Sequence, residues 1–246
     1  MSVLPNLTGR VALVTGASRG IGAAVALALA EVGADVAVNY RQRAAEAADV
    51  GANIEAIGRR TMIAQADVSD GACVSELIDK VEQTLGPIDV LVNNAGIAIS
   101  RDLDTLTEAD FDLTIAVNLK SAFLCTQAVL PGMRARGWGR IVNMSSGAAR
   151  GAGGVGLHYN ASKAGMEGLT RGYAARLVDQ GVTVNALAPS LIATDMIADR
   201  NPATDKRLAS GRLGRCEEVA QAVLMVAGNA YMTGQTVQLN GGRSFL

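Results

Sequence analysis

The sequence has few of the residues that mark a secreted, metal-binding or nucleic-acid-binding protein. Its three cysteines, Cys73, Cys125 and Cys216, stand far apart, with no CxxC pair and no Cys/His cluster. A disulfide framework and a metal site are therefore not supported. Lys and Arg number 22 against 23 Asp and Glu, which gives a formal net charge of −1. That balance creates no general attraction to nucleic acid or to an anionic membrane.

We expect neither a signal peptide nor a membrane-spanning segment in this sequence. Its N-terminus, MSVLPNLTGR, has no apolar core flanked by basic residues. No uninterrupted apolar run is long enough to span a bilayer. Aromatic residues make up only 3% of the chain and hydrophobic residues 49%, so Ala, Val and Leu must supply most of the core. We expect a cytoplasmic protein with a sizeable core and no membrane partner.

Short apolar runs alternate with longer helical patterns. The runs are nearly continuously apolar and bounded by Gly, Pro, Asn or Asp, which is typical of parallel strands buried on both faces. The predicted strands are Val11–Thr15, Asp35–Tyr40, Thr61–Asp67, Ile88–Asn94, Arg140–Ser146, Val182–Pro189 and Thr236–Asn240. The predicted helices include Ile21–Val32, Gly71–Leu85, Glu108–Arg136, Tyr159–Asp179 and Glu217–Ala227.

This alternation predicts a single Rossmann-type domain over residues 1–246. Its core would be a doubly wound parallel α/β sheet of about seven strands with helices on both faces. The irregular stretch at about 190–215 follows a strand end, where open α/β sheets bind their ligands. We expect a substrate-site lid there, with a simple surface excursion as the alternative.

A glycine-rich turn, TGASRGIG, joins the first predicted strand to the first predicted helix. Gly16 allows a tight turn, Gly20 lets the backbone approach a pyrophosphate, and Gly22 lets the helix pack close to the sheet. The helix N-terminus presents free N–H groups and a positive dipole end to phosphate. Because the Gly-Lys-Ser/Thr ending of a P-loop is missing, the turn indicates a dinucleotide site.

The second strand indicates which dinucleotide is bound. Proteins that bind NAD place a carboxylate at its end to accept hydrogen bonds from the ribose 2′-hydroxyl. Here that strand ends Asn39-Tyr40-Arg41, without an acid. Arg19, inside the glycine turn, and Arg41 would suit a 2′-phosphate, which favours NADP(H) over NAD(H). The alternative is that both arginines simply face water.

Seven short motifs in a fixed order now point to one family. They are TGASRGIG, ADVS, NNAG, VNLKS, IVNMSS, YNASK and APSLIATDM. In this respect the chain resembles the short-chain dehydrogenase/reductases along nearly its whole length. The resemblance implies that NADP(H) is contacted by Gly16, Ser18, Arg19, Gly20, Ile21, Gly22, Asn39, Tyr40, Arg41, Asp67, Val68, Asn94, Ala95, Gly96, Tyr159, Lys163, Pro189, Ile192 and Thr194.

The resemblance also implies a catalytic set of Asn118, Ser146, Tyr159 and Lys163. A free Tyr has a pKa of about 10, and a nearby ammonium lowers it by stabilising the phenolate. Tyr159 and Lys163 are four residues apart on a predicted helix and therefore share a face, although such neighbours also occur by chance. By resemblance, Ser146 holds the substrate oxygen, Lys163 also binds the nicotinamide ribose, and Asn118 anchors a water of a proton relay.

Two further residues beside these need a separate interpretation. Ser145 competes with Ser146, but the family's spacing of thirteen residues before the Tyr selects Ser146 and leaves Ser145 to packing or a backbone hydrogen bond. The sole histidine, His158, points about a quarter-turn away from Tyr159. We interpret it as a helix-start or pocket-wall residue.

The substrate would contact Ser146, Ala148 and Tyr159. Within the family, the motifs most resemble 3-oxoacyl-[acyl-carrier-protein] reductases, which implies a 3-oxoacyl thioester on acyl-carrier protein or CoA. A small secondary alcohol, ketone, diol or sugar is the alternative, and a non-catalytic NADPH-sensing protein is a third possibility. Carrier-protein binding needs basic residues, but Gln180 stands where carrier-binding members have one. Arg134 and Arg136 are the candidates, with ordinary solvated helix-end charges as the alternative. The resemblance further implies a homotetramer that pairs the helices Glu108–Arg136 and Tyr159–Asp179.

Overall fold

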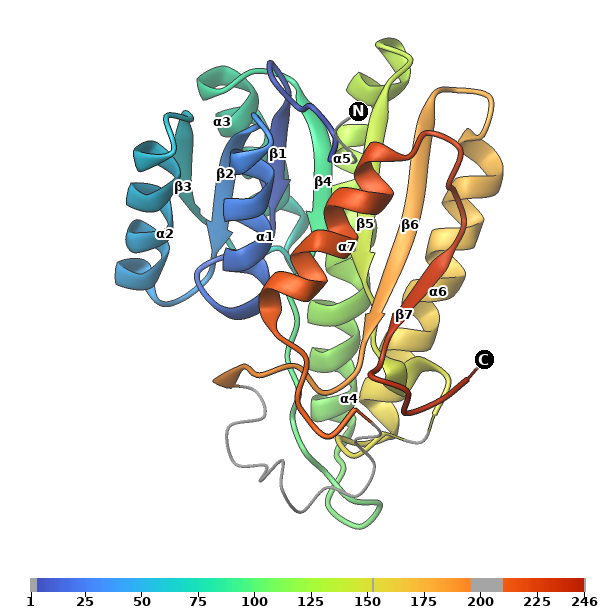
Figure 1. Ribbon diagram of the computed structural model, residues 1–246. Coiled ribbons are helices and arrows are strands. Elements are labelled where there is room, and N and C mark those ends of the chain that lie inside the picture. Colours follow the sequence, from blue (N-terminus) through green and yellow to red (C-terminus); the bar gives the residue numbers. More distant parts are fainter. Residues whose placement is uncertain (1–3, 152, 196–209, 246) are drawn as a thin grey trace.

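The computed structural model describes residues 4–151, 153–195 and 210–245 (Figure 1). Seven strands form one sheet in the order β3-β2-β1-β4-β5-β6-β7, and every neighbouring pair is parallel. The strands are β1 (Val11–Val14), β2 (Asp35–Tyr40), β3 (Thr61–Gln65), β4 (Ile88–Asn93), β5 (Gly139–Met144), β6 (Val182–Pro189) and β7 (Thr236–Leu239). The predicted α/β fold is confirmed, and each strand ends within two residues of its predicted end.

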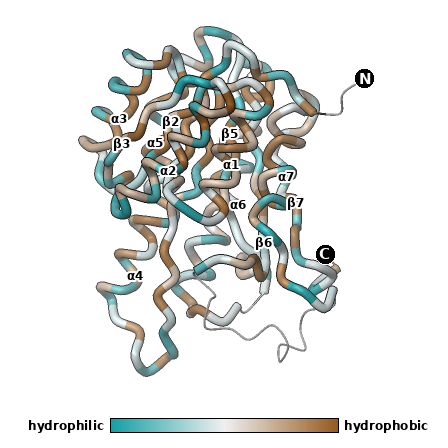
Figure 2. The backbone as a smooth tube through the Cα atoms, turned by 60° about the vertical axis from the view of Figure 1, so that its left-hand side comes forward, coloured by the Kyte–Doolittle hydropathy of each residue, from teal (hydrophilic) through white to brown (hydrophobic). Residues whose placement is uncertain are grey.

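Helices cover both faces of the sheet (Figure 1). They are α1 (Gly20–Glu31), α2 (Ala44–Ala56), α3 (Gly71–Thr84), α4 (Glu108–Ile115), α5 (Ser121–Ala135), α6 (Leu157–Leu177) and α7 (Cys216–Gly228). Residues of α1, α2 and α7 form one hydrophobic core with the sheet, and residues of α3, α5 and α6 form a second core. Figure 2 shows hydrophobic residues, in brown, along the strands and at intervals along the helices.

The strand order reverses between β1 and β4, because β2 and β3 lie on one side of β1 while β4 to β7 follow on the other. In a parallel sheet the crevice at such a switch point opens beyond the carboxyl ends of the strands. The segments that follow β1, β4 and β5 therefore meet at one edge. These are the segments that carry the glycine turn, the NNAG motif and Ser146.

The prediction of one helix over Glu108–Arg136 is wrong in one respect. A π-helical turn, η1 (Ala116–Lys120), separates α4 from α5. Such turns arise where one extra residue is accommodated in a helix, and they are frequent at functional sites. Glu108–Ala135 is apolar and long enough to cross a membrane by composition, but half of the tested window is buried inside the fold. Its buried side chains, such as Cys125 and Val129, belong to the second core, as expected of a core helix.

Part of the predicted lid lies outside the described residues. The structure describes 190–195 and 210–215, where Ile192 pairs with Gly214 in an isolated parallel bridge. The Ala193 N–H also donates to the Gly214 carbonyl oxygen at 2.8 Å. The two described ends of the stretch therefore lie together beside the carboxyl ends of the strands.

Candidate active site

The glycine turn is built by close backbone contacts. Gly16 and Gly20 have φ values of +63° and +58°, which non-glycine residues rarely adopt. A Cβ at Gly16 would lie 2.9 Å from the Cα atom of Ala95. A Cβ at Gly22 would lie 2.5 Å from the Gly16 carbonyl oxygen. Both positions therefore require glycine, as the sequence predicts. Gly20, Ile21 and Gly22, in the first turn of α1, line the crevice.

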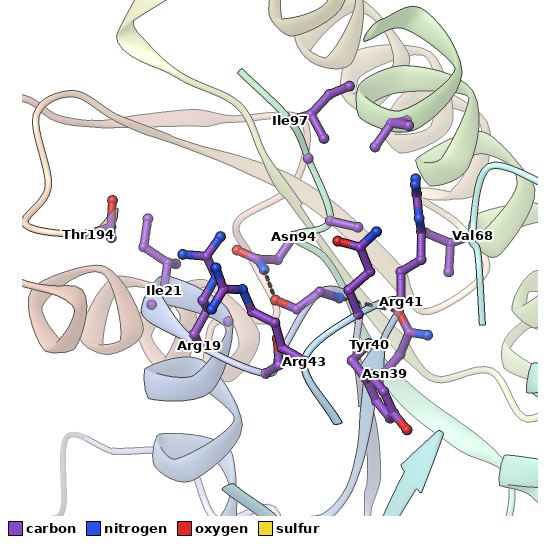
Figure 3. Close-up of a pocket in the computed structure, with 18 of the residues that line it drawn as sticks. Arg19, Ile21, Asn39, Tyr40, Arg41, Arg43, Val68, Asn94, Ile97 and Thr194 are labelled. Atoms are coloured by element: carbon purple, nitrogen blue, oxygen red, sulfur yellow. Dashed lines mark hydrogen bonds between the residues drawn. The ribbon is translucent and has the colours of Figure 1, made fainter. Parts of the chain in front are cut away.

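Two asparagines hold this turn in place. The Asn94 side chain donates to the carbonyl oxygens of Thr15 and Gly16 at 2.9 and 3.0 Å (Figure 3). The Asn39 side chain accepts from the Gly16 N–H at 3.3 Å and donates to the carbonyl oxygens of Ala64 and Ala66. Both residues line the crevice, but these side-chain bonds support the turn.

The crevice is an elongated cavity of about 480 Å³, within the range of known ligand sites. Fifteen of the predicted cofactor residues line it: Gly16, Ser18, Arg19, Gly20, Ile21, Gly22, Asn39, Tyr40, Arg41, Asp67, Val68, Asn94, Ala95, Gly96 and Thr194. Sequence reasoning did not identify Gln42, Arg43, Ala66, Ile97, Val117, Ala193 and Asp195, which line it too.

Three arginines, Arg19, Arg41 and Arg43, line the crevice. Figure 3 shows Arg19 and Arg43 next to each other, with Arg41 beside Val68. Within the chain each guanidinium is paired: Arg19 with Asp195, Arg41 with Asp67 at 3.5 Å, and Arg43 with Glu46 at 2.9 Å. The pKa of Asp67 is affected by burial, which raises it, but hydrogen bonds from Ser69 and the charge of Arg41 outweigh that effect and lower it.

Arg43 has a backbone conformation that sets it apart. Among the described residues it is the one non-glycine residue with a positive φ, at 67°. The left-handed region costs a non-glycine residue about 1–2 kcal/mol. Strain of this kind often occurs where a side chain is held for binding. The sequence signal that could have identified Arg43 is its position in the segment QRAA after β2, where it adds a third basic residue to Arg19 and Arg41.

A second, smaller cavity of about 110 Å³ opens from the first. It is lined by Ser146, Tyr159 and Lys163, together with the predicted cofactor residues Pro189, Ile192 and Thr194. Ile21, Asn94, Gly96, Ile97 and Thr194 line both cavities, so the two spaces are continuous. Met144, Ser145 and Ser190, which were not predicted, line the smaller cavity as well.

The three residues predicted to be catalytic in this cavity lie on two neighbouring segments. Ser146 directly follows the end of β5 and precedes a short 3-10 turn, η2 (Gly147–Ala149), whereas Tyr159 and Lys163 lie one helical turn apart on α6. The Lys163 ammonium donates to the Met144 carbonyl oxygen at 2.8 Å and lies 5.7 Å from the centre of the Tyr159 ring. Sequence-distant groups are therefore brought together at the carboxyl end of β5.

Burial shifts the pKa values of both titrating side chains. It lowers the pKa of Lys163 to about 8. It raises the pKa of Tyr159, and a side-chain hydrogen bond with Ser146 acts in the opposite direction. The expected lowering of the Tyr159 pKa by the Lys163 ammonium is not found in the chain alone, because burial outweighs the other influences on the phenol.

Asn118 lies in the π-helical turn and is fully buried. Its side chain accepts from the Ile97 N–H at 2.7 Å and donates to the Ile97 carbonyl oxygen and the Ser162 hydroxyl at 3.0 and 3.2 Å. Both amide protons are thus used to fix the segment after β4 against α6. Ile97 lines both cavities, so Asn118 shapes the site through this contact.

The remaining predicted residues occupy neighbouring positions. Ala148 donates its N–H to the Ser146 hydroxyl at 3.2 Å, but it is not among the residues that line the two cavities. Ser145 donates its hydroxyl to the Lys163 carbonyl oxygen at 3.1 Å, so its predicted role as a backbone hydrogen-bonding residue is confirmed. His158 is the second residue of α6 and is fully buried, with Nε2 3.0 Å from the Ile99 carbonyl oxygen. It is a helix-start residue, as interpreted.

The glycine cradle, the open N-terminus of α1 and the continuous cavity fit a phosphate-bridged dinucleotide whose reactive end would lie beside Tyr159. The fold and this site define a dinucleotide-dependent oxidoreductase of the Rossmann class. The sequence profile of the short chain dehydrogenases matches residues 10–205. The chain belongs to the short-chain dehydrogenase family, whose members act on CH–OH and C=O groups.

Known relatives cover nearly the full length of the chain. It is 43% identical to a 3-oxoacyl-[acyl-carrier-protein] reductase of Synechocystis, over 96% of this chain and 97% of that protein. It is 41% identical to the (2S)-[(R)-hydroxy(phenyl)methyl]succinyl-CoA dehydrogenase subunit BbsD of Thauera aromatica, over 97% and 98%. A Burkholderia cenocepacia short chain dehydrogenase solved in complex with NADP is 40% identical, with a TM-score of 0.88 over 97% and 99%.

Proposed function

We propose that this protein is an NADPH-dependent reductase that converts a 3-oxoacyl thioester into the 3-hydroxyacyl thioester. The observation that carries the proposal is the continuity of the two cavities, one lined by the phosphate turn and one by Ser146, Tyr159 and Lys163. A ketone in the smaller cavity would face the reactive end of a dinucleotide in the larger one. We also propose that residues 1–246 form one domain, that about 190–215 form a lid over the substrate site, and that the protein is cytoplasmic.

The chain's own part in the reaction is positioning and proton delivery. The reduced nicotinamide, when bound, supplies the hydride. The Ser146 hydroxyl holds the carbonyl oxygen, and the Tyr159 phenol gives that oxygen its proton. The raised pKa of Tyr159 suits this direction, because it keeps the phenol protonated near neutral pH. Lys163 completes the site by binding the ribose, and Asn118 belongs to the proposed proton relay.

The preference for NADP(H) over NAD(H) rests on the arginines. A 2′-phosphate beside Arg19, Arg41 and Arg43 would meet three guanidinium groups, which bind phosphate through charge-assisted hydrogen bonds. Each arginine pairs with a carboxylate in the chain, and the phosphate would compete with that partner. The relative from Burkholderia cenocepacia binds NADP, which supports the same preference.

The thioester substrate is favoured by what two relatives share. The Synechocystis relative is named for an acyl-carrier-protein thioester and the Thauera aromatica relative for a CoA thioester. The proposal therefore names the acyl thioester as the substrate class and acyl-carrier protein as a possible partner. Both candidate docking residues already have partners in the chain. Arg134 is hydrogen-bonded to the Gln180 side chain, and Arg136 donates to the Ile88 carbonyl oxygen and lies 3.6 Å from the Asp89 carboxylate.

One assay tests the whole proposal. Purified protein is incubated with NADPH and, in turn, acetoacetyl-CoA, acetoacetyl-acyl-carrier protein and a panel of small ketones, and absorbance at the NADPH band is followed. Turnover of either thioester supports the proposal, and their relative kcat/KM identifies the carrier. Turnover of small ketones alone would establish the small-alcohol alternative. NADPH binding without any turnover would establish a sensor.

A further inference from the structure

Helix α6 carries a buried carboxylate one turn beyond Lys163. Glu167 is only 4% exposed. It lies four residues after Lys163 and eight after Tyr159, so the three side chains follow one another along one side of the helix. The proposed chemistry uses no carboxylate there. An apolar side chain of similar size would fill the same space without the free-energy cost of burying a charge.

The partner of this carboxylate belongs to the segment that carries Ser146. Arg150 donates from Nε to Oε2 of Glu167 at 2.9 Å. Arg150 is the first residue after η2, and η2 begins directly after Ser146. The Ser145 hydroxyl lies 3.4 Å from the other carboxylate oxygen, Oε1. Glu167 therefore contacts the chain on both sides of the Ser146 turn, at Ser145 and at Arg150.

A second contact fixes the same segment from the other end of the site. The Asn160 side chain donates to the Gly151 carbonyl oxygen at 3.1 Å, and Asn160 is the residue after Tyr159. Inside the turn, the Ala148 N–H donates to the Ser146 hydroxyl at 3.2 Å. The direction of the Ser146 hydroxyl thus depends on where the turn lies relative to α6.

We propose that the Arg150–Glu167 ion pair is a positioning device that fixes the Ser146 turn against α6 and so sets the Ser146 hydroxyl against the Tyr159 hydroxyl. Arg150 and Glu167 are positioning residues, because neither lines the two cavities in the described part of the chain. The inference deepens the proposed reductase function, and its activity readout rests on that function.

The position of the Ser146 turn also affects the pKa of Tyr159. The hydrogen bond with Ser146 lowers the pKa of Tyr159 against the effect of burial. If the turn loosens, that hydrogen bond weakens and the pKa of Tyr159 rises. Because a proton donor must be protonated, the high-pH limb of kcat/KM then moves to higher pH. A purely structural ion pair would change stability and leave this titration as it is.

The test replaces the pair with apolar residues in the double variant Arg150→Met/Glu167→Leu. Such replacements of buried ion pairs are often neutral or stabilising, so the variant should fold. Glu167→Gln, which keeps the shape and removes the charge, is the second variant. The protein contains four tyrosines. Tyr159 can therefore be followed by NMR of ¹³Cζ-labelled tyrosine, with its signal assigned through Tyr159→Phe.

Three changes are expected in both variants. The pKa of Tyr159 rises above the wild-type value. The amides of residues 147–151 exchange hydrogen about 10-fold faster, as local opening becomes easier. With an active substrate, kcat falls about 10-fold or more while KM and the NADPH dissociation constant stay within about 2-fold, as expected for a group that acts only on the reacting geometry.

Asp35→Asn is the matched control. Asp35 is also a buried carboxylate and pairs with Arg59 and Arg60 at 2.6 and 2.7 Å, but it lies at the amino end of β2, away from the site. It should lower stability and leave the titration of Tyr159 unchanged. Unchanged Tyr159 titration and amide exchange in the folded double variant would overturn the proposal, and neither measurement needs cofactor or substrate. Absence of turnover in the wild-type protein would instead count against the reductase function alone.

Discussion

The ammonium of Lys163 is bound to the Met144 carbonyl oxygen at 2.8 Å and lies 5.7 Å from the centre of the Tyr159 ring. Lys163 is therefore held by the end of β5, below the aromatic ring of the residue it is proposed to assist. Because both side chains are buried, the pKa of Lys163 is lowered to about 8 and that of Tyr159 is raised. This pair predicts separable effects on catalysis and on stability.

Tyr159→Phe should abolish proton delivery and leave the dinucleotide site intact. Loss of a general acid costs about 10²–10⁴-fold in rate, so kcat should fall by that factor, while NADPH affinity, measured by fluorescence titration, stays within about 2-fold. Tyr173→Phe is the control, because the Tyr173 hydroxyl accepts from Gln127 outside the site. Wild-type rates in the Tyr159 variant would show that another group donates the proton.

Lys163→Met should change the pH dependence of stability. The folded-state pKa of Lys163, about 8, lies below its ordinary value of 10.5, so the unfolded chain binds more protons between these pH values. The free energy of unfolding of the wild type should therefore rise, relative to the variant, as pH increases from about 8 to 10.5. The full difference corresponds to about 3 kcal/mol and would be measured by urea unfolding across this range.

The control for this prediction is Lys80→Met, since the Lys80 side chain is largely exposed. Its stability difference from the wild type should not vary over the same pH range. If the stabilities of the Lys163 variant and the wild type changed in parallel with pH, the Lys163 ammonium would be solvated in the folded chain.

Much of the fold could be predicted because the signals were local. Strands buried on both faces, such as Val11–Val14 and Ile88–Asn93, are continuous apolar runs. Gly22 is required by a contact within the glycine turn, and Gly16 has a positive φ that favours glycine. Order along the chain then gave the parallel α/β architecture. The cofactor crevice followed, because the carboxyl ends of these strands must meet at one edge.

The unpredicted features depend on contacts between distant residues or on backbone geometry without a sequence signal. The π-helical turn at Asn118 leaves the apolar periodicity of the surrounding helix unbroken, so the pattern indicated one helix from 108 to 136. The left-handed backbone of Arg43, at the N-cap of α2, has no sequence signal, because most side chains disfavour it. The pairing of Arg150 with Glu167 joins residues 17 positions apart across a turn.

Arg43→Gly should weaken NADPH binding and stabilise the fold. Glycine adopts a φ of 67° without strain, so the variant should gain about 0.5–1 kcal/mol of stability. Loss of a charge-assisted hydrogen bond costs about 1.5–3 kcal/mol, so the KM for NADPH should rise about 10- to 100-fold while that for NADH is unchanged. Arg176→Ala on the outer face of α6 is the control. An equal rise in KM for NADPH and for NADH would show that Arg43 does not contact the 2′-phosphate.

Phe123→Asp should break the proposed homotetramer. An apolar groove is lined by Ile115 of α4, Leu119 of η1, Phe123 of α5 and Leu169 of α6, and Phe123 is 45% exposed. Gly165, also in this groove, packs against Leu119, whose side chain would lie 2.7 Å from a Cβ at this position. Exposed apolar surface of this kind favours association, and a carboxylate placed in it opposes burial.

Light scattering after size exclusion should show a tetramer for the wild type and smaller species for the Phe123 variant. Leu103→Asp, at an 81% exposed position, is the control and should remain a tetramer. A Phe123 variant that stays tetrameric would show that the interface lies elsewhere. A monomeric wild type would show that there is no such interface.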